Sequence, residues 1–62
     1  MIRRTVIAND IVLYTHVRTF DTRTEAMCFR EGVEYTNDSN LTVTGMQEIQ
    51  GRFQVLLLDE DA

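Results

Sequence analysis

The sequence predicts an α+β fold of the order β-β-α-β-β, in which one helix packs on one face of a small, mainly antiparallel sheet. Three observations support this fold class. A helix-capping motif opens an amphipathic stretch, an alternating strand pair follows it, and segments rich in β-branched and aromatic residues precede it. We expect residues 1–62 to form a single domain. A chain of 62 residues buries little surface, so its margin of stability is narrow.

The clearest element is a helix predicted over residues 23–36. Thr22 and Glu25 form a T-x-x-E capping box, in which the Thr22 hydroxyl accepts from the Glu25 amide and the Glu25 carboxylate reaches back to the Thr22 amide. The helix should end within residues 37–40, because Asn37 tolerates the left-handed conformation found at helix C-termini. At 100° per residue, one side of the helix is apolar and carries Ala26, Phe29 and Val33. Cys28, Gly32 and Tyr35 border this apolar side. The place of Gly32 indicates that it lets the helix lie close to the sheet.

A hairpin is predicted after the helix, because residues 41–44 and 53–55 alternate between apolar and polar side chains. A three-residue loop at 49–51 is favoured over a two-residue loop at 50–51. The shorter loop would bring polar side chains onto the face of Val43. With the longer loop, the core that faces the helix comprises Ala26, Phe29, Val33, Leu41, Val43, Phe53, Val55 and Leu57.

Before the helix, residues 4–8 and 11–20 have the composition of strands, with a turn at Asn9 and Asp10. Asn-Asp is a weaker turn signal than Asn-Gly, so one long bulged strand is the alternative to a hairpin.

The charge is distributed unevenly along the chain. Residues 1–30 carry five arginines and three carboxylates, a net charge of +2, whereas residues 31–62 carry one arginine and seven carboxylates, a net charge of −6. This balance disfavours nucleic acid as the partner, because phosphate contacts require positive surface. It suits a basic patch on another protein. Nucleic-acid binding is a less favoured hypothesis for this chain. Such a module would use Arg3, Arg4, Arg18, Tyr14 and Phe20.

Neither a catalytic site, nor a cofactor site, nor a metal site is predicted. His16 is the only histidine and lies on a predicted strand without an identifiable partner, so it is read as a surface residue. Cys28 is the only cysteine, borders the apolar side of the helix and is read as a small hydrophobic residue. These two residues lack the spacing of metal ligands, and the three glycines form no phosphate-binding loop. We therefore expect a binding protein without enzymatic activity.

The single thiol and the lack of a signal sequence predict a cytoplasmic protein. The longest apolar run, residues 55–58, is far shorter than the roughly 20 residues of a membrane span, so no membrane partner is expected.

The predicted partner-binding surface lies on the face of the sheet opposite the helix. If Val55 and Leu57 face the helix, Leu56 and Leu58 face away from it, and in the fold as predicted nothing in the chain covers them. The acidic end that follows is expected to be mobile and to contribute charge, either toward a basic partner or as a solubilising tail. The predicted partner-binding residues are Tyr14, Leu56, Leu58, Asp59, Glu60 and Asp61. Two copies that cover each other through this face would form a homodimer.

The stretch from Phe20 to Val43 resembles short uncharacterised proteins of tailed bacteriophages, in which a strand leads into a T-x-x-E-A helix, a VNDS-like turn, a second strand and an acidic end. The resemblance covers about two fifths of the chain and rests on Glu25-Ala26, Phe29, Gly32 to Tyr35 and Asn37 to Ser39. Thr36 stands where valine is expected. The resemblance implies a stoichiometric inhibitor or modulator of a host protein, active in host takeover or counter-defence, and it carries over no binding residue. A structural homo-oligomer is the alternative.

Overall fold

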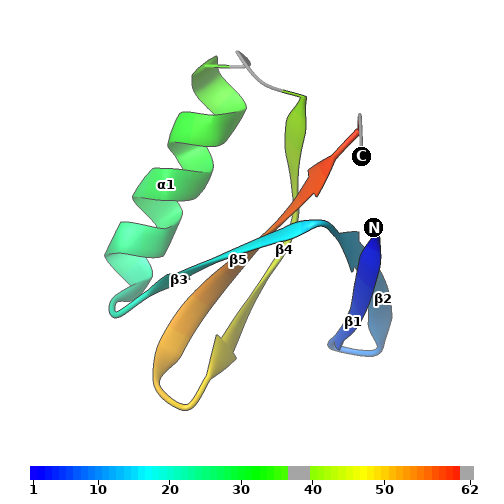
Figure 1. Ribbon diagram of the computed structural model, residues 1–62. Coiled ribbons are helices and arrows are strands. Elements are labelled where there is room, and N and C mark those ends of the chain that lie inside the picture. Colours follow the sequence, from blue (N-terminus) through cyan, green and yellow to red (C-terminus); the bar gives the residue numbers. More distant parts are fainter. Residues whose placement is uncertain (37–39, 61–62) are drawn as a thin grey trace.

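The fold is α+β, with five strands and one helix among the described residues. The computed structural model describes residues 1–36 and 40–60. Its elements are β1 (Arg3–Ile7), β2 (Asp10–Tyr14), β3 (His16–Phe20), α1 (Arg23–Thr36), β4 (Leu41–Ile49) and β5 (Arg52–Asp59). β1 and β2 form a two-stranded antiparallel sheet, and β3, β5 and β4 form a three-stranded antiparallel sheet with β5 at its centre (Figure 1). The predicted fold class is therefore confirmed, and the element order is β-β-β-α-β-β.

The helix is where the capping box predicts it. α1 begins at Arg23, and the Glu25 amide donates to the Thr22 hydroxyl oxygen at 3.2 Å. The Glu25 carboxylate accepts from the Thr22 hydroxyl at 3.2 Å instead of from the Thr22 amide. α1 ends at Thr36, and of the expected stop region, residues 37–39 lie outside the described residues.

The turn of the first hairpin lies one residue earlier than predicted. Ile7 pairs with Asp10, so the loop consists of Ala8 and Asn9, both with positive φ (49° and 74°). Such a two-residue loop matches the right-handed twist of the flanking strands, although alanine adopts this conformation at a cost. The expected turn at Asn9 and Asp10 is thus wrong by one position. The long segment that follows is divided at Thr15 into β2 and β3, which belong to different sheets.

The second hairpin has a two-residue loop, so the predicted three-residue loop is wrong. Ile49 pairs with Arg52, and both loop residues, Gln50 and Gly51, have positive φ. A β-bulge between Val43 and Gly45 shifts the register by one residue. On the side of the bulge away from the loop, the pairing is as predicted, with Val43 opposite Leu57. Between the bulge and the loop, Met46 lies opposite Val55, where the prediction has Gly45.

The core between the helix and the three-stranded sheet contains all the predicted residues. Ala26, Val55 and Leu57 are buried, and partly buried hydrophobic side chains pack against them: Phe20, Phe29, Val33, Leu41, Val43, Met46 and Phe53. The ring centroids of Phe20 and Phe29 lie 5.2 Å apart. Two expectations for the helix border are wrong, because Cys28 is exposed and a Cβ at Gly32 would meet nothing within 4 Å.

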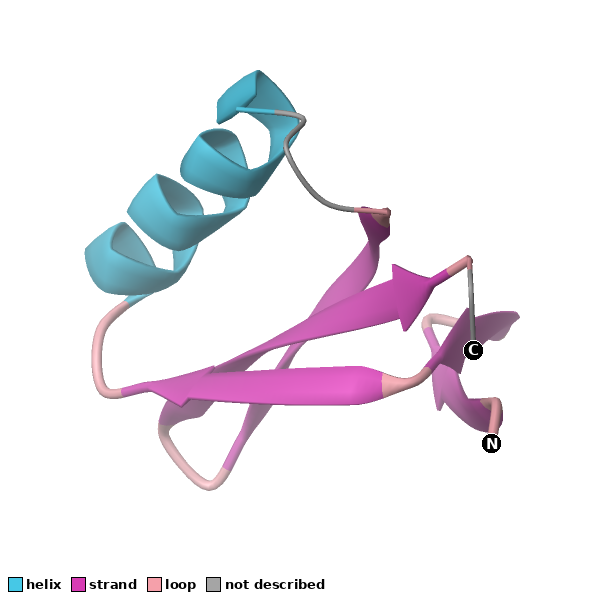
Figure 2. Ribbon diagram, turned by 45° about the horizontal axis from the view of Figure 1, so that its top comes forward, coloured by secondary structure: helices cyan, strands magenta, loops and turns pink. Residues whose placement is uncertain are grey.

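The other face of the sheet is covered by the β1–β2 hairpin, which lies across the sheet from α1 (Figures 1 and 2). The close approach occurs at Gly45, where an added Cβ would lie 3.0 Å from Ile7 Cδ1 and 3.1 Å from Val12 Cγ1. Leu56 Cδ1 lies 3.5 Å from the same point. Glycine at this position therefore lets the hairpin pack directly over Leu56, and the molecule has three layers.

We predict that Thr22→Ala lowers the free energy of unfolding by about 1 kcal/mol, because the Glu25 amide loses its acceptor. Urea denaturation followed by circular dichroism measures the change. An unchanged midpoint would show that the cap contributes nothing.

We predict that Gly45→Val lowers the free energy of unfolding by about 1–3 kcal/mol, because the new side chain displaces Ile7 and Val12. Gly32→Ala is the matched control, since its Cβ meets open space in a helix and should stabilise the protein by about 0.5–1 kcal/mol. Both changes are measured by urea denaturation. Equal effects of the two substitutions would contradict the close packing at Gly45.

Candidate interaction surfaces

The predicted partner-binding face is largely covered by the chain itself. Leu56 is 1% exposed, and Tyr14 and Leu58 are only partly exposed. The prediction that nothing covers this face is therefore wrong. It placed Tyr14 on the same face of one sheet as Leu56, whereas Tyr14 lies with Ile7 and Val12 on the inner face of a separate hairpin that packs over Leu56.

An exposed apolar surface lies instead on the outer face of the hairpin. Val6 lies directly opposite Ile11, and Arg4 opposite Leu13, so these four side chains share one face of the two-stranded sheet. Val6, Ile11 and Leu13 are 64%, 65% and 48% exposed. We call Arg4, Val6, Ile11 and Leu13 the outer hairpin face. Ile2, which precedes β1, is also exposed.

The sequence contains a signal for this outer face. Successive residues of a strand point to opposite faces, and within residues 4–7 and 10–14 both of the resulting faces carry apolar side chains. The predicted partner-binding residues included only Tyr14 from this hairpin, and Tyr14 belongs to the inner face.

The acidic end is partly built into the fold, contrary to the prediction that it is mobile. Asp59 is the last residue of β5, pairs with Leu41, and its amide donates to the Thr15 hydroxyl oxygen at 2.8 Å. The Glu60 amide donates to the Asn40 carbonyl at 3.2 Å. The Glu60 carboxylate also accepts from the Thr42 hydroxyl at 3.3 Å. Asp61 lies outside the described residues.

Thr15 holds the junction between the two sheets. Its amide donates to the Leu57 carbonyl at 2.7 Å, and its hydroxyl lies 3.3 Å from the same carbonyl and 2.8 Å from His16 Nδ1. The hydroxyl has one proton, so it donates to only one of these acceptors at a time while it accepts from the Asp59 amide. Thr15 thereby ties the start of β3 to the end of β5.

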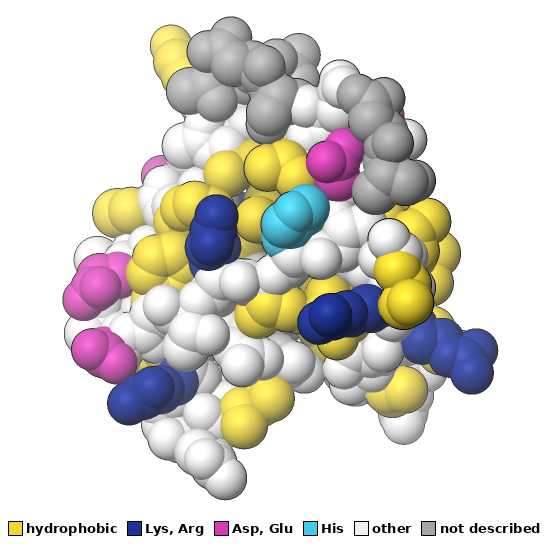
Figure 3. Space-filling view, in the orientation of Figure 1, with side chains coloured by type: hydrophobic (Ala, Val, Ile, Leu, Met, Phe, Trp, Pro, Cys, Tyr) yellow, Lys and Arg dark blue, Asp and Glu magenta, His cyan; other side chains and the backbone are white. Residues whose placement is uncertain are grey.

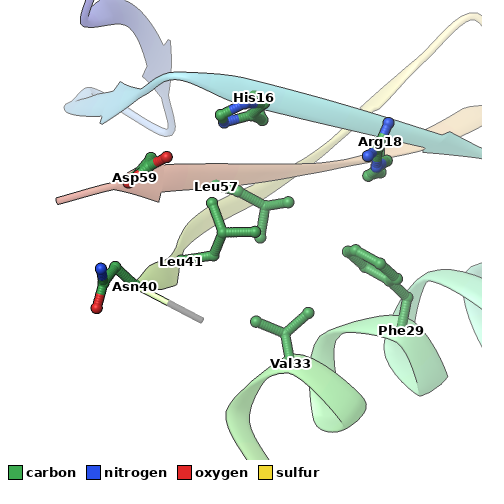
Figure 4. A pocket seen from close by; sticks show the side chains of 8 residues that line it. All are labelled: His16, Arg18, Phe29, Val33, Asn40, Leu41, Leu57 and Asp59. Carbon is green, nitrogen blue, oxygen red and sulfur yellow. The ribbon is translucent and has the colours of Figure 1, made fainter. Parts of the chain in front are cut away.

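A groove of about 420 Å³ lies between β3 and α1, on the helix side of the sheet. His16 and Arg18 project from β3, Phe29 and Val33 face them from α1, and Leu57 lies at the base (Figure 4). Asp59 and Asn40 line the end away from Arg18, and Leu41 completes the wall. Figure 3 shows hydrophobic side chains exposed around the histidine on this face of the molecule, with a cationic side chain nearby. The groove thus joins an apolar floor to a rim that has arginine at one end, a carboxylate at the other and histidine between them.

The described residues contain no group of three His, Cys, Asp or Glu side chains placed to hold a metal ion. His16 is exposed and has the Thr15 hydroxyl as its hydrogen-bond neighbour. Within residues 1–36 and 40–60, no helix has the length and apolar character needed to cross a membrane.

Comparison with protein-family models, curated proteins and solved structures gave no match to this chain.

We predict that Thr15→Val lowers the free energy of unfolding by about 1–2 kcal/mol, because the Asp59 amide loses its acceptor while the side-chain shape is kept. Denaturant titration measures the loss. Thr19→Val is the control, since Thr19 is an exposed threonine on β3, the strand that follows Thr15. Equal stabilities for the two variants would show that the junction does not depend on the hydroxyl.

Proposed function

We propose that this chain is a small protein-binding module that contacts its partner through the outer hairpin face. The observation that carries the proposal is the exposure of Val6, Ile11 and Leu13 side by side on a hairpin whose inner face already covers the core. Contiguous exposed apolar side chains of this kind mark interaction sites on soluble domains.

The surface area supports an interface. The chain exposes 4686 Å². A compact monomer of its mass, 7.2 kDa, exposes roughly 4100 Å² by the scaling of area with mass. Among the described residues, only Ala26, Val55, Leu56 and Leu57 are fully buried hydrophobic residues. A partner that covers the outer hairpin face would add apolar burial to a molecule that has little of its own.

The composition of the face indicates the character of the partner. Arg4 lies among the three apolar side chains, and arginine surrounded by apolar residues is typical of the centres of protein interfaces. Arg3 pairs with Tyr14 on the other face of the same hairpin, so this end of the molecule is basic. A partner surface with an apolar centre and acidic groups around it complements these features.

The resemblance to small phage proteins supports one form of this function. In that form the partner is a bacterial host protein, the chain acts in the host cytoplasm as a stoichiometric inhibitor or modulator, and no chemical step takes place. The acidic residues Asp59 and Glu60, at the end of β5, would contribute to the electrostatic field that guides association.

A homodimer is the second candidate, and the same outer hairpin face favours it. Two copies related by a two-fold axis would bury the Val6, Ile11 and Leu13 side chains of both chains against each other. Light scattering distinguishes the candidates, because a dimer scatters as twice the 7.2 kDa of the chain.

We predict that Ile11→Asp abolishes partner binding while the fold is retained. Ile11 is 65% exposed, so the substitution should cost less than about 1 kcal/mol of stability. Ile49→Asp is the matched control, because Ile49 is another exposed strand isoleucine (43%), at the end of β4. The measurement compares proteins captured from bacterial lysate by the three immobilised chains.

The proposal expects a protein that the unmodified chain and Ile49→Asp retain and that Ile11→Asp loses. In the homodimer, Ile11→Asp instead halves the mass measured by light scattering. Identical captured proteins and identical masses for all three chains would rule out the outer hairpin face as an interface.

A further inference from the structure

The strand β3 forms an open edge of the three-stranded sheet. Among the described strands, β3 pairs only with β5, and the β1–β2 hairpin packs over β4 and β5 instead. An edge strand presents backbone N–H and C=O groups that another strand can pair with. β3 is 5 residues long, which is sufficient for an added strand of ordinary length.

The side chains of β3 divide into two sets. His16, Arg18 and Phe20 lie opposite Leu57, Val55 and Phe53, so they are on the helix side, and Val17 lies opposite Leu56 on the hairpin side. His16 and Arg18 are both exposed at the rim of the groove. Within residues 1–36 and 40–60, no carboxylate lies within ion-pair distance of Arg18; the two ion pairs there are Arg30–Glu34 and Arg52–Asp21.

We propose that β3 and the groove beside it bind an extended acidic segment of a partner protein, which adds to the sheet as a further strand next to β3. Backbone hydrogen bonds to β3 would hold the segment, and an acidic side chain opposite Arg18 would select it. The groove floor of Phe29, Val33 and Leu57 accommodates an apolar side chain next to that acid.

The geometry defines the pattern of the segment. Alternate residues of the added strand face the helix side, where Arg18 favours a carboxylate, and the residues between them face the side of Val17, which favours an apolar residue. At the far end of the groove Asp59 repels a second acid. The acidic residue therefore belongs at the Arg18 end of the groove.

A second copy of the chain fits this edge less well. In the antiparallel register that pairs all five residues of β3 with their copies, Arg18 lies opposite another Arg18. Like charges directly opposite each other destabilise strand pairs. The charge of the edge thus favours a foreign acidic strand.

The proposal concerns a different surface from the outer hairpin face and stands independently of it. The test uses the full chain labelled with ¹⁵N and a synthetic valine peptide, as long as β3, that carries a single glutamate at the position opposite Arg18. We expect saturable shifts of the amide signals of residues 16–20. We also expect that Arg18→Glu raises the dissociation constant at least fivefold, whereas the control Arg23→Glu, an exposed arginine at the start of α1, changes it less than about twofold.

Two further peptides separate strand addition from simple charge attraction. A peptide in which lysine replaces glutamate, and one in which a central proline removes an N–H donor, should both fail to bind. Binding by the proline peptide, shifts centred outside β3, equal affinities of Arg18→Glu and Arg23→Glu, or no binding of the valine–glutamate peptide would each overturn the proposal. Ile11→Asp should bind this peptide as the unmodified chain does, so failure here leaves the outer hairpin face untouched.

Discussion

The burial of β5 from both sides is the interaction on which the remainder of the structure depends. Val55 and Leu57 lie beneath α1, and Leu56, between them, lies beneath the β1–β2 hairpin. These three consecutive side chains are each at most 1% exposed. Full burial of one such side chain contributes about 1.5–3 kcal/mol, which is a large share of the stability of a small domain. The helix layer and the hairpin layer are therefore held together chiefly through one strand.

This arrangement also determines where the molecule can bind. Because the hairpin covers Leu56 with its inner face, the apolar residues of its outer face are displaced to the surface, on the far side of the molecule from α1. The groove beside β3 lies on the helix side of the sheet. The two candidate surfaces thus use different elements and oppose each other across the sheet, so one partner can occupy each without a clash.

The parts of the fold that local sequence signals specify were predictable. The capping box at Thr22 located the helix, and side-chain periodicity identified the core around Val55 and Leu57. The bulge near Thr44, the division at Thr15 and the left-handed conformations of Ala8 and Gln50 were not predictable, because long-range contacts impose them on residues without a local preference. The division at Thr15 had the largest effect: it sends the hairpin over Leu56, so the candidate binding surface was assigned to the wrong side of that hairpin.

The central place of β5 has a consequence for synthesis of the chain. β5 follows α1 and the other strands in sequence, yet it is the strand against which they bury their apolar side chains. Short hairpins and a helix of 14 residues are marginal in isolation. At about 5–20 residues per second, several seconds pass between emergence of the first hairpin and of β5 from the ribosome. During that interval the nascent elements have no complete core to join, and the fold can be completed only after the strand at its centre has been made.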